Sequence, residues 1–587
     1  MRAVIPSLRS SHRYLRQSRR PATAISTWRL ASRPQHVALS PLRRALSHAQ
    51  HRYIHVPSHL DEPTIYALST ASGKAAIAVI RISGPACRQI YEGLCPSTAF
   101  PKPRYATLRK LYSPHQAPSP ATLLDSGALV LYFPSPRTVT GEDLLELHVH
   151  GGPAIVRAVL AAIPQCSTKP EGSVAHSIRY AEPGEFTRRA FANNRTDLPQ
   201  IESLGETLSA ATEQQRQISV RGTTSSLAVR YEQWRMLLLA ARGELEALID
   251  FSEDQHFDES PAQLCASVAE QVRVLRAQME AHVANAVRGE LLRSGISMAL
   301  LGAPNAGKSS LLNRIVGREA AIVSQEAGTT RDIVEVSVDL GGWLVKIGDM
   351  AGLRRAGLVG ADIVGAVEQE GIKRAKQRAL ESDVLIVVQD ATAEMDPEVT
   401  ETAKMCVESG INVVVAINKI DQLSSPDIAK AAWIEQVRSA LGIAESRISF
   451  ISCREATTAT TTSQSRDPGN VQSFLTTLMQ TFRDMTAALV PDSDPDPSIW
   501  QESLGATERQ RVLLSECLAH LEAFISAVTP ELTEEHSAYG IEPDAADDID
   551  IVLAAESLRS AAEALARITG RGDGGDVEEV LGVVFEK

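Results

Sequence analysis

A glycine-rich loop in the middle of the chain has the residue types of a phosphate-binding site. "GAPNAGKS" runs from Gly302 to Ser309 and fits G-x-x-x-x-G-K-[ST], between the apolar stretch Met298 to Leu301 and an amphipathic helical pattern. The glycines let backbone N–H groups wrap phosphates, Lys308 can reach the terminal oxygens, and the Ser309 hydroxyl can ligate Mg²⁺. The loop predicts a nucleoside triphosphate site.

Two later segments can complete the magnesium and terminal phosphate contacts. "KIGDMAG" puts Asp349 at the end of a predicted strand, where it can hold Mg²⁺ through water, and Gly352 where its backbone amide can sense the last phosphate. "SQEAGTTRD" lies between the loop and Asp349. A switch loop there must bring a threonine hydroxyl to Mg²⁺, and Thr330, beside Thr329, is the candidate.

The nucleotide base is predicted to be guanine. "VVVAINKIDQL" puts Asn418, Lys419 and Asp421 after an apolar strand, and an aspartate there can accept both hydrogen bonds from the guanine N1/N2 edge. "FISCREA" supplies a loop behind the base. The predicted GTP-binding residues are Asn305, Ala306, Gly307, Lys308, Ser309, Ser310, Ser324, Gly328, Thr329, Thr330, Asp349, Gly352, Asn418, Lys419, Asp421, Ser452, Cys453 and Arg454. These motifs predict a Ras-like GTPase domain with a mostly parallel sheet.

Bulk composition narrows the class of protein. At roughly 150 residues per domain, 587 residues predict three or four domains. No apolar run approaches a membrane span, so no transmembrane helix is expected. Seven scattered cysteines without metal spacing favour a reduced compartment. The net charge of −12 argues against a protein that coats nucleic acid, although a local basic patch would not appear in that sum.

The first sixty residues have a composition of their own. They contain eleven Arg, no Lys and no acidic residue, and the first carboxylate is Asp61. Arg-rich, Ser-rich and acid-poor segments are typical of mitochondrial transit peptides, and a disordered basic arm for RNA or lipid is the competing interpretation. We therefore predict mitochondrial, matrix localisation.

The flanks of the nucleotide motifs predict two further domains. Strand patterns in "TIYALST", "AAIAVIRISG", "GALVLYFP" and "DLLELHVHG" indicate an α+β domain up to about residue 180. Amphipathic helical patterns fill "LPQIESLGETLSAATEQQRQISVRG", "RMLLLAARGELEALIDF" and "CASVAEQVRVLRAQMEAHVANAV", and resume in "TERQRVLLSECLAHLEAFISAV" and "IDIVLAAESLRSAAEALARITG". The prediction is a multidomain chain in which a GTPase domain is inserted into an all-α domain.

Several long motifs together resemble one family. "EPTIYALSTASGKAAIAVIRISGPA", "TVTGEDLLELHVHGGPAIV", "YAEPGEFTRRAFANNRTDLPQIESL", "GAPNAGKSSLLN", "AGTTRD" and "AGLR" resemble the MnmE (TrmE) tRNA-modification GTPases, from Asp61 to nearly Lys587. The Arg-rich leader points to a mitochondrial form. The resemblance implies the boundaries 1–60 (transit peptide), 61–182 (tetrahydrofolate-binding and dimerisation), 183–292 and 486–587 (helical), and 293–485 (G domain).

The resemblance also implies cofactors and further site residues. The first domain would bind a one-carbon tetrahydrofolate, such as the 5,10-methylene form, through Arg81, Glu146 and Arg195, where the family more often has Lys. Catalytic residues would be Thr330, Gly352 and Glu368, although Glu368 also fits a solvated helix face. In GTPases that use potassium, an Asn three residues before the phosphate-loop Lys is a ligand of the ion, and Asn305 has this place. The implied K⁺ ligands are Asn305, Ser324, Glu326 and Thr329. Asn305 could instead only shape the loop. Mg²⁺ ligands would be Ser309, Thr330 and, through water, Asp349.

Three departures from the family pattern stand out. Met350 replaces the usual Thr of the Asp-Thr-Ala-Gly motif, and the segment before Glu368 is several residues longer than usual. The chain ends "VLGVVFEK", without the family's Phe-Cys-x-Gly-Lys tail. A truncated gene model is the expected explanation and a genuinely altered protein the second. No cysteine of this sequence takes the role of the tail cysteine by position.

The leading hypothesis is a homodimeric mitochondrial GTPase that acts on tRNA. With a flavin-dependent MnmG-type partner, it would install a carboxymethylaminomethyl-type group at C5 of the wobble uridine from a folate one-carbon unit. The alternatives are a GTP-regulated RNA-binding or mitoribosome-assembly factor, and a non-catalytic folate-binding scaffold. No exposed basic-aromatic pattern typical of RNA readers is visible in the chain that follows the predicted transit peptide.

Overall fold

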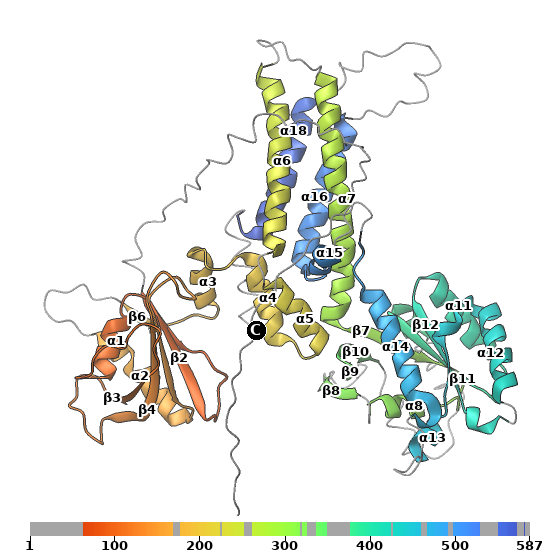
Figure 1. The fold of residues 1–587 in the computed structure, drawn as a ribbon, viewed down its shortest axis with the longest axis horizontal. Helices are drawn as coiled ribbons and strands as arrows, with labels where there is room; N and C mark the ends of the chain where they lie inside the picture. Colours follow the sequence, from red (N-terminus) through yellow and green to blue (C-terminus); the bar gives the residue numbers. More distant parts are fainter. Residues whose placement is uncertain are drawn as a thin grey trace, which may run out of the picture. The chain divides into compact units, whose positions relative to one another are not determined.

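The structure is a computed structural model of the full chain (Figure 1). It describes residues 63–167, 177–223, 226–251, 261–316, 320–325, 336–348, 376–423, 426–458, 467–490, 497–528, 550–571 and 580.

A six-stranded mixed sheet forms the first folded region. Its strand order is β3-β4-β5-β2-β1-β6, so β3 and β6 are the edge strands. Helices α1 and α2 pack with the residues of one face into a single hydrophobic core. The other face carries partly exposed side chains, because period-2 alternation along each strand sends every second residue there. The elements are β1 (Thr64–Leu68), β2 (Ile77–Ser83), α1 (Cys87–Leu94), β3 (Thr107–Tyr112), β4 (Leu123–Phe133), β5 (Leu144–His150), α2 (Pro153–Ala162) and β6 (Ile178–Tyr180).

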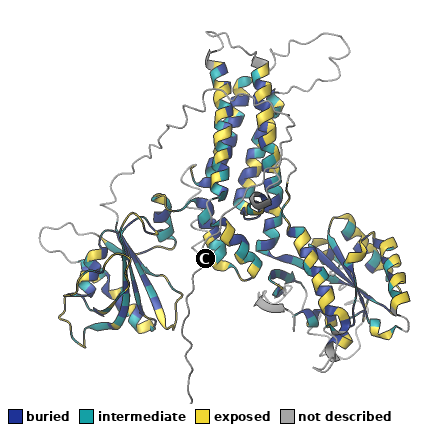
Figure 2. Cartoon of the chain, in the orientation of Figure 1, coloured by how far each residue is buried: buried dark blue, intermediate teal, exposed yellow. Residues whose placement is uncertain are grey.

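A helical region follows the first sheet and is completed near the end of the chain. One hydrophobic core joins residues of α6 and α7 to residues of α16 and α18, which lie on opposite sides of the nucleotide motifs in sequence. Figure 2 shows buried stripes along these helices, as the amphipathic patterns predicted. The elements are α3 (Glu185–Ala192), α4 (Leu198–Ser209), α5 (Glu213–Gly222), α6 (Ser226–Phe251), α7 (Pro261–Ser294), α15 (Pro497–Ser503), α16 (Glu508–Val528) and α18 (Ile551–Thr569).

One helical pattern is divided in the structure. The stretch from Leu198 to Gly222 forms two helices, α4 and α5, and not one. Asp197 and Thr212 each accept a hydrogen bond from the backbone at the third helical position, and a Gln there bonds back to the cap. The capping box at Asp197 starts α4, and the capping box at Thr212 starts α5. Amphipathic periodicity does not contain this signal.

The second sheet has seven strands in the order β13-β12-β11-β7-β10-β9-β8. Strands β13, β12, β11, β7 and β10 run parallel, whereas β9 and β8 pair antiparallel. All seven residues of β11 except Asp390 are buried, as expected for a strand covered on both faces. The bounds are β7 (Ile296–Leu301), α8 (Lys308–Arg314), β8 (Ala320–Gln325), β9 (Val336–Leu340), β10 (Trp343–Ile347), β11 (Val384–Asp390), α11 (Pro397–Glu408), β12 (Asn412–Asn418), α12 (Pro426–Leu441), β13 (Ile448–Phe450), α13 (Cys453–Thr458) and α14 (Val471–Thr486).

The architecture confirms the predicted fold class. An α+β region, an all-α region and an inserted Ras-like sheet occur in the expected order. All seven cysteines lie in the described residues, where each is buried and none forms a disulfide. Burial raises the pKa of Cys95, Cys166 and Cys517 to about 12, so these thiols resist ionisation. Within the described ranges, no helix combines the length and the apolarity of a membrane span.

Candidate functional site

The phosphate loop leaves β7 at the edge where the parallel strands end. A Cβ on Gly302 would lie 2.2 Å from the Val388 carbonyl oxygen, so only glycine allows the loop to pass β11 this closely. Asn305 and Gly307 have left-handed φ angles of 60° and 107°. The Lys308 ammonium donates to the Gly302 and Ala303 carbonyls at 2.6 and 2.9 Å. The lysine therefore closes the loop on itself.

The base-reading residues are assembled around the phosphate loop. The Asn418 side chain donates to the Ala306 carbonyl at 2.9 Å and accepts from the Cys453 backbone N–H at 3.2 Å. The Ser452 hydroxyl donates to an Asp421 carboxylate oxygen at 2.7 Å. These contacts join three segments that are far apart in sequence into one corner. A carboxylate held in this way is ready to accept the two donors of a guanine edge.

Asp390 is a site residue that the sequence motifs did not single out. It ends β11, and its carboxylate pairs with the Lys419 ammonium at 2.5 Å. Lys419 itself has a left-handed φ of 67°. Burial alone would raise the pKa of Asp390, but hydrogen bonds from Lys419 and Thr392 lower it below its ordinary value. An acidic residue at the end of a strand that begins with five apolar residues, in "VLIVVQD", is the signal that could have identified it.

Burial lowers the pKa of Lys308 from its ordinary value, which is the effect expected of an ammonium with few charged neighbours. Phosphate oxygens would remove that penalty. Of the remaining GTP-site candidates, the Ser309 and Ser310 side chains are exposed and Ser324 lies in β8. Arg454 belongs to α13. The following predicted residues lie outside the described residues: Glu326, Gly328, Thr329, Thr330, Asp349, Gly352 and Glu368.

The predicted folate residues divide between the open face of the first sheet and the turn after α3. Strand register sets Arg81 directly opposite Glu146, and their side chains pair at 2.9 Å with 29% and 15% exposure. The His148 ring lies 3.3 Å from the other Glu146 oxygen. Arg195 donates to the Thr138 carbonyl at 2.9 Å. The structure therefore brings two of the three candidates into contact.

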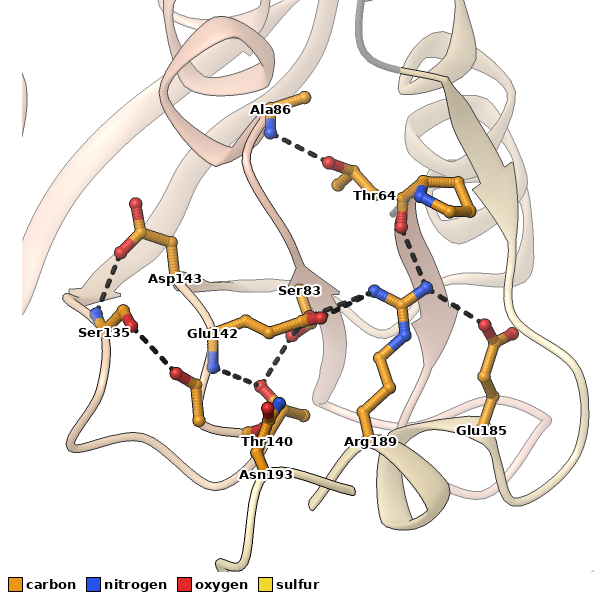
Figure 3. A network of polar contacts seen from close by, with 12 residues as sticks. Thr64, Ser83, Ala86, Ser135, Thr140, Glu142, Asp143, Glu185, Arg189 and Asn193 are labelled. Atoms are coloured by element: carbon orange, nitrogen blue, oxygen red, sulfur yellow. Dashed lines mark hydrogen bonds and ion pairs between the residues drawn. The ribbon is translucent and has the colours of Figure 1, made fainter. Parts of the chain in front are cut away.

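A buried ion network links α3 to the strands and holds the turn that carries Arg195 (Figure 3). Arg189 donates to both carboxylate oxygens of Glu142 at 3.0 Å and to Glu185 at 3.1 Å. Ser83 donates to Glu142 at 2.7 Å, and the Asn193 amide donates to the Thr140 carbonyl at 2.7 Å. Sequence reasoning missed this network, although charged residues inside "TGEDLLEL" and "EPGEFTRRAF" were a signal.

The last described residue also belongs to this neighbourhood. Val580 is buried in a small cluster with Leu198 and Ile201, against which Phe191 packs. Leu198 and Ile201 belong to the first turn of α4, directly after the Arg195 turn. The chain thus returns near its end to the segment that carries a predicted folate contact.

Helix α7 contacts the chain both where it enters the nucleotide-binding region, before β7, and where it leaves, after α14. At its end it passes directly into β7. Its fully buried Asn285 donates to the Leu489 carbonyl at 3.0 Å and accepts from the Leu489 N–H at 2.6 Å, just after α14. Arg293 donates to the Leu504 carbonyl at 3.0 Å and lies 3.4 Å from Glu206 of α4. A displacement of the sheet would therefore act on α7 at two points.

Comparison with known proteins gives matches along most of the chain. Residues 64–195 match the family described as GTP-binding protein TrmE N-terminus, and residues 198–587 match the MnmE helical domain. The tRNA modification GTPase mss1, mitochondrial, of Schizosaccharomyces pombe is 36% identical over 531 residues, which cover 89% of this chain and 94% of the relative.

Two more relatives extend the same result. The mitochondrial 5-taurinomethyluridine-[tRNA] synthase subunit GTPB3 of Danio rerio is 36% identical, over 89% of this chain and 92% of its own. The tRNA modification GTPase MnmE of Paramagnetospirillum magneticum is 36% identical over 89% and 98%. The phosphate loop, the base corner and these matches agree, and the chain belongs to the MnmE (TrmE) family of tRNA modification GTPases.

Proposed function

We propose that this protein is a mitochondrial GTPase that takes part in modification of the wobble uridine of tRNA at C5. The group added would be of the carboxymethylaminomethyl type, with a folate one-carbon donor and an MnmG-type flavoprotein as partner. The observation that carries the proposal is the assembled base corner, in which Asn418 and Asp421 are held by Ala306, Cys453 and Ser452. Membership of the family supports tRNA as the molecule that is modified.

The described residues fit GTP with Mg²⁺. Asp421 would accept the guanine N1 and N2 hydrogens, and Asn418 would keep the phosphate loop and base loop together. Lys308 would exchange its two carbonyl contacts for phosphate oxygens, and Ser309 would offer its hydroxyl to Mg²⁺. The bound metal and triphosphate would supply the hydrolysable bond and its charge neutralisation. The remaining proposed metal ligands, Thr330 and Asp349, belong to the undescribed segments.

Potassium is proposed as an activator through Asn305. This residue is exposed in the phosphate loop, and its left-handed backbone is one that Asn adopts more readily than most residues. Hydrolysis measured in KCl and in NaCl tests the proposal. Equal rates in both salts would leave Asn305 with the loop-shaping role only.

Tetrahydrofolate is proposed to bind at the open face of the first sheet and the turn after α3. Arg81 and Arg195 could bind the carboxylates of the folate tail, and Glu146 could accept hydrogens from the pterin ring. The Arg189 network supports the proposal because it fixes the turn that presents Arg195. Isothermal titration with 5-formyltetrahydrofolate measures binding, and the variant Arg81→Ala should abolish it.

GTP hydrolysis is proposed to drive movement and not to form the new carbon bond. The direct passage of α7 into β7 and the contact of Asn285 with Leu489 support this, since they join α7 to both chain connections of the sheet. Arg293 ties the same end of α7 to Leu504. A homodimer and a location in the mitochondrial matrix complete the proposal. The mitochondrial relatives support the organelle. The proposed domains are residues 61–182, the helical parts 183–292 and 486–587, and the G domain 293–485.

Nucleoside analysis of mitochondrial tRNA tests the function directly. Cells that lack the protein should lose the C5 modification of wobble uridine, and the wild-type gene should restore it, whereas a Lys308→Ala gene should not. An unchanged wobble nucleoside together with a deficit of one mitoribosomal subunit would overturn the proposal and favour a ribosome-assembly factor.

A further inference from the structure

The β3 edge of the first sheet carries a concentration of positive charge in an acidic protein. No acidic residue occurs between Glu92 and Asp125, although the whole chain has a net charge of −12. We define the β3 rim as Lys102, Arg104, Arg109 and Lys110, together with Arg137, which follows β4. The fold brings Arg137 to the others, because Arg104 donates to its carbonyl at 2.5 Å.

The cations of the β3 rim differ from most other arginines of the described chain. Helical arginines are neutralised by neighbours, as in Arg216 with Glu213 at 2.7 Å and Arg235 with Glu232 at 2.9 Å. Within the described ranges, no member of the β3 rim forms an ion pair. The side chains of Lys102, Lys110 and Arg137 are exposed and have no described hydrogen bond either. The rim therefore presents net positive charge to solvent.

Exposed apolar groups lie among these cations. Tyr105 is 68% exposed and Leu108 is 67% exposed. Arg104 lies over the Phe133 ring at 5.7 Å, and Arg109 donates to the Tyr91 hydroxyl at 2.7 Å. Two of the cations are thus fixed in place by aromatic side chains. Unpaired cations beside an exposed aromatic ring are the combination that binds phosphates and stacks on a base.

We propose that the β3 rim is an RNA-docking surface, and that it contacts the backbone of the tRNA whose wobble base is to be modified. This deepens the proposed function and rests on it. Lys102, Arg104, Lys110 and Arg137 bind phosphates, and Tyr105 stacks on an unpaired base. No such basic-aromatic pattern was expected from the sequence. Most of it lies in the segment from Lys102 to Lys110, and the fold adds Arg137 from the end of β4.

The place of the rim agrees with the chemistry proposed for the open face. Strand order separates β3 from β2, which carries Arg81, by three inter-strand spacings. At about 4.8 Å each, these make about 14 Å between the two strands. Enzymes that act on a base turn its nucleotide out of the stack. An RNA held at the rim could therefore present a loop base to the Arg81 and Glu146 face.

Edge protection and self-association account for the charge of the rim less well than RNA does. Charges on an edge strand protect it from pairing with other strands, but Lys102, Arg104 and Arg137 lie in turns outside β3. Exposed Tyr105 and Leu108 would also work against such protection. A second copy of this chain is an unfavourable occupant because a two-fold contact would set the positive rim against itself.

The test uses the full chain and a fluorescently labelled transcript of a mitochondrial tRNA with a wobble uridine. Fluorescence anisotropy measures the dissociation constant at several salt concentrations. The variant Lys102→Gln/Lys110→Gln/Arg137→Gln should bind about 10- to 100-fold more weakly at about 0.1 M salt. The magnitude of the slope of log affinity against log salt should fall by about 2 to 3, because each lost phosphate contact removes roughly 0.7 to 0.9.

A matched variant controls for total charge. Arg216→Gln/Lys404→Gln/Lys430→Gln removes three positive charges from ion-paired helical positions and should keep wild-type tRNA affinity and salt slope. Tyr105→Ala should weaken binding about tenfold without a change of slope, because stacking releases no counterions. GTP hydrolysis without tRNA should be the same in all three variants, which shows that they are folded.

The possible outcomes distinguish a failure of the proposed docking surface from a failure of the proposed function. Wild-type protein that fails to bind the tRNA transcript would count against the proposed function itself. Wild-type binding that the rim variant retains, with an unchanged salt slope, would overturn only the docking surface. A rim variant that loses binding to vesicles containing anionic phospholipid, while it keeps tRNA affinity, would assign the rim to a membrane surface and would also overturn the proposal.

Discussion

The two sheets of this protein build their candidate sites in different ways. In the nucleotide-binding sheet, the polar site residues lie at or just after strand ends, and all but Asp390 belong to a short motif such as "NKID" or "GKSS". In the first sheet, Arg81 and Glu146 lie within strands, 65 positions apart, and meet through register. The first site can be read in consecutive letters, whereas the second exists only once strands have paired.

The difference has a consequence for stability. The nucleotide corner uses neutral amides, hydroxyls and partly exposed charges. The first sheet buries Arg189 and Glu142 with side-chain exposures of 8% and 7%. A buried ion pair costs desolvation that only its partner compensates, so removing one member leaves an isolated charge. Substitutions at the nucleotide-binding sheet should therefore reduce function without unfolding the protein, whereas substitutions in the ion network of the first sheet should reduce stability.

The largest effect is expected from Arg189→Ala. Loss of the guanidinium leaves Glu142 buried without its arginine partner, whereas Glu185 keeps Arg179. The free energy of unfolding should fall by about 3–5 kcal/mol. Urea denaturation measures the change. Arg88→Ala, at an exposed pair with Glu92, should cost less than about 1 kcal/mol. A similar small loss for both variants would remove the distinction between the two sheets.

Lys308→Ala should affect catalysis without affecting the fold. Its ammonium bonds only loop carbonyls in the described structure, so unfolding should change little. The value of kcat/KM for GTP should fall about 10²- to 10³-fold, as for other removed groups that stabilise transition-state charge. Lys404→Ala, at an exposed position of α11, is the control. If Lys308→Ala unfolds the protein, the nucleotide sheet depends on its charges as the first sheet does.

The helical bundle sharpens the comparison because its core buries hydrogen-bonded polar side chains that are neutral. His282 is fully buried, its Nε2 lies 2.9 Å from the Tyr231 hydroxyl, and burial lowers its pKa from 6.5 to about 3. As pH falls below 6.5, the unfolded chain binds a proton that the folded chain excludes, so stability is lost. The loss should be about 2 kcal/mol between about pH 7 and pH 5.

The measurement compares wild type with His282→Gln at both pH values. The comparison is needed because burial raises the pKa of Glu206 to about 7, which changes stability in the opposite direction with pH. The variant should lose about 2 kcal/mol less than wild type over this interval. Identical pH dependence in both proteins would mean that His282 titrates normally.

The smallest effect is expected from Asp390→Asn. Lys419 would lose its charged partner at the end of β11, and GTP affinity should fall about tenfold, in line with one charge-assisted hydrogen bond. Titration with a fluorescent GTP analogue measures the affinity. Asp427→Asn, at a fully exposed position of α12, should leave the affinity unchanged. An unaltered affinity in Asp390→Asn would show that the motif residues alone position the base corner.

Local pattern was sufficient for much of the fold. Apolar runs predicted the central strands of both sheets, and 3.6-residue periodicity predicted α6, α7, α16 and α18. Periodicity could not divide α4 from α5, because the capping boxes at Asp197 and Thr212 depend on single polar side chains. The positions of Thr330, Asp349 and Glu368 stay predictions.

The sequence by itself determined the nucleotide corner, because one loop or strand end supplies each of its functions and chemistry follows from residue type and spacing. It also determined the family. The tertiary structure alone decided which charges meet: Arg189 with Glu142, Asp390 with Lys419, and Arg137 with the turn before β3. These partners are separated by tens of residues in sequence, and only the folded arrangement of strands, helices and turns brings their bonding atoms together.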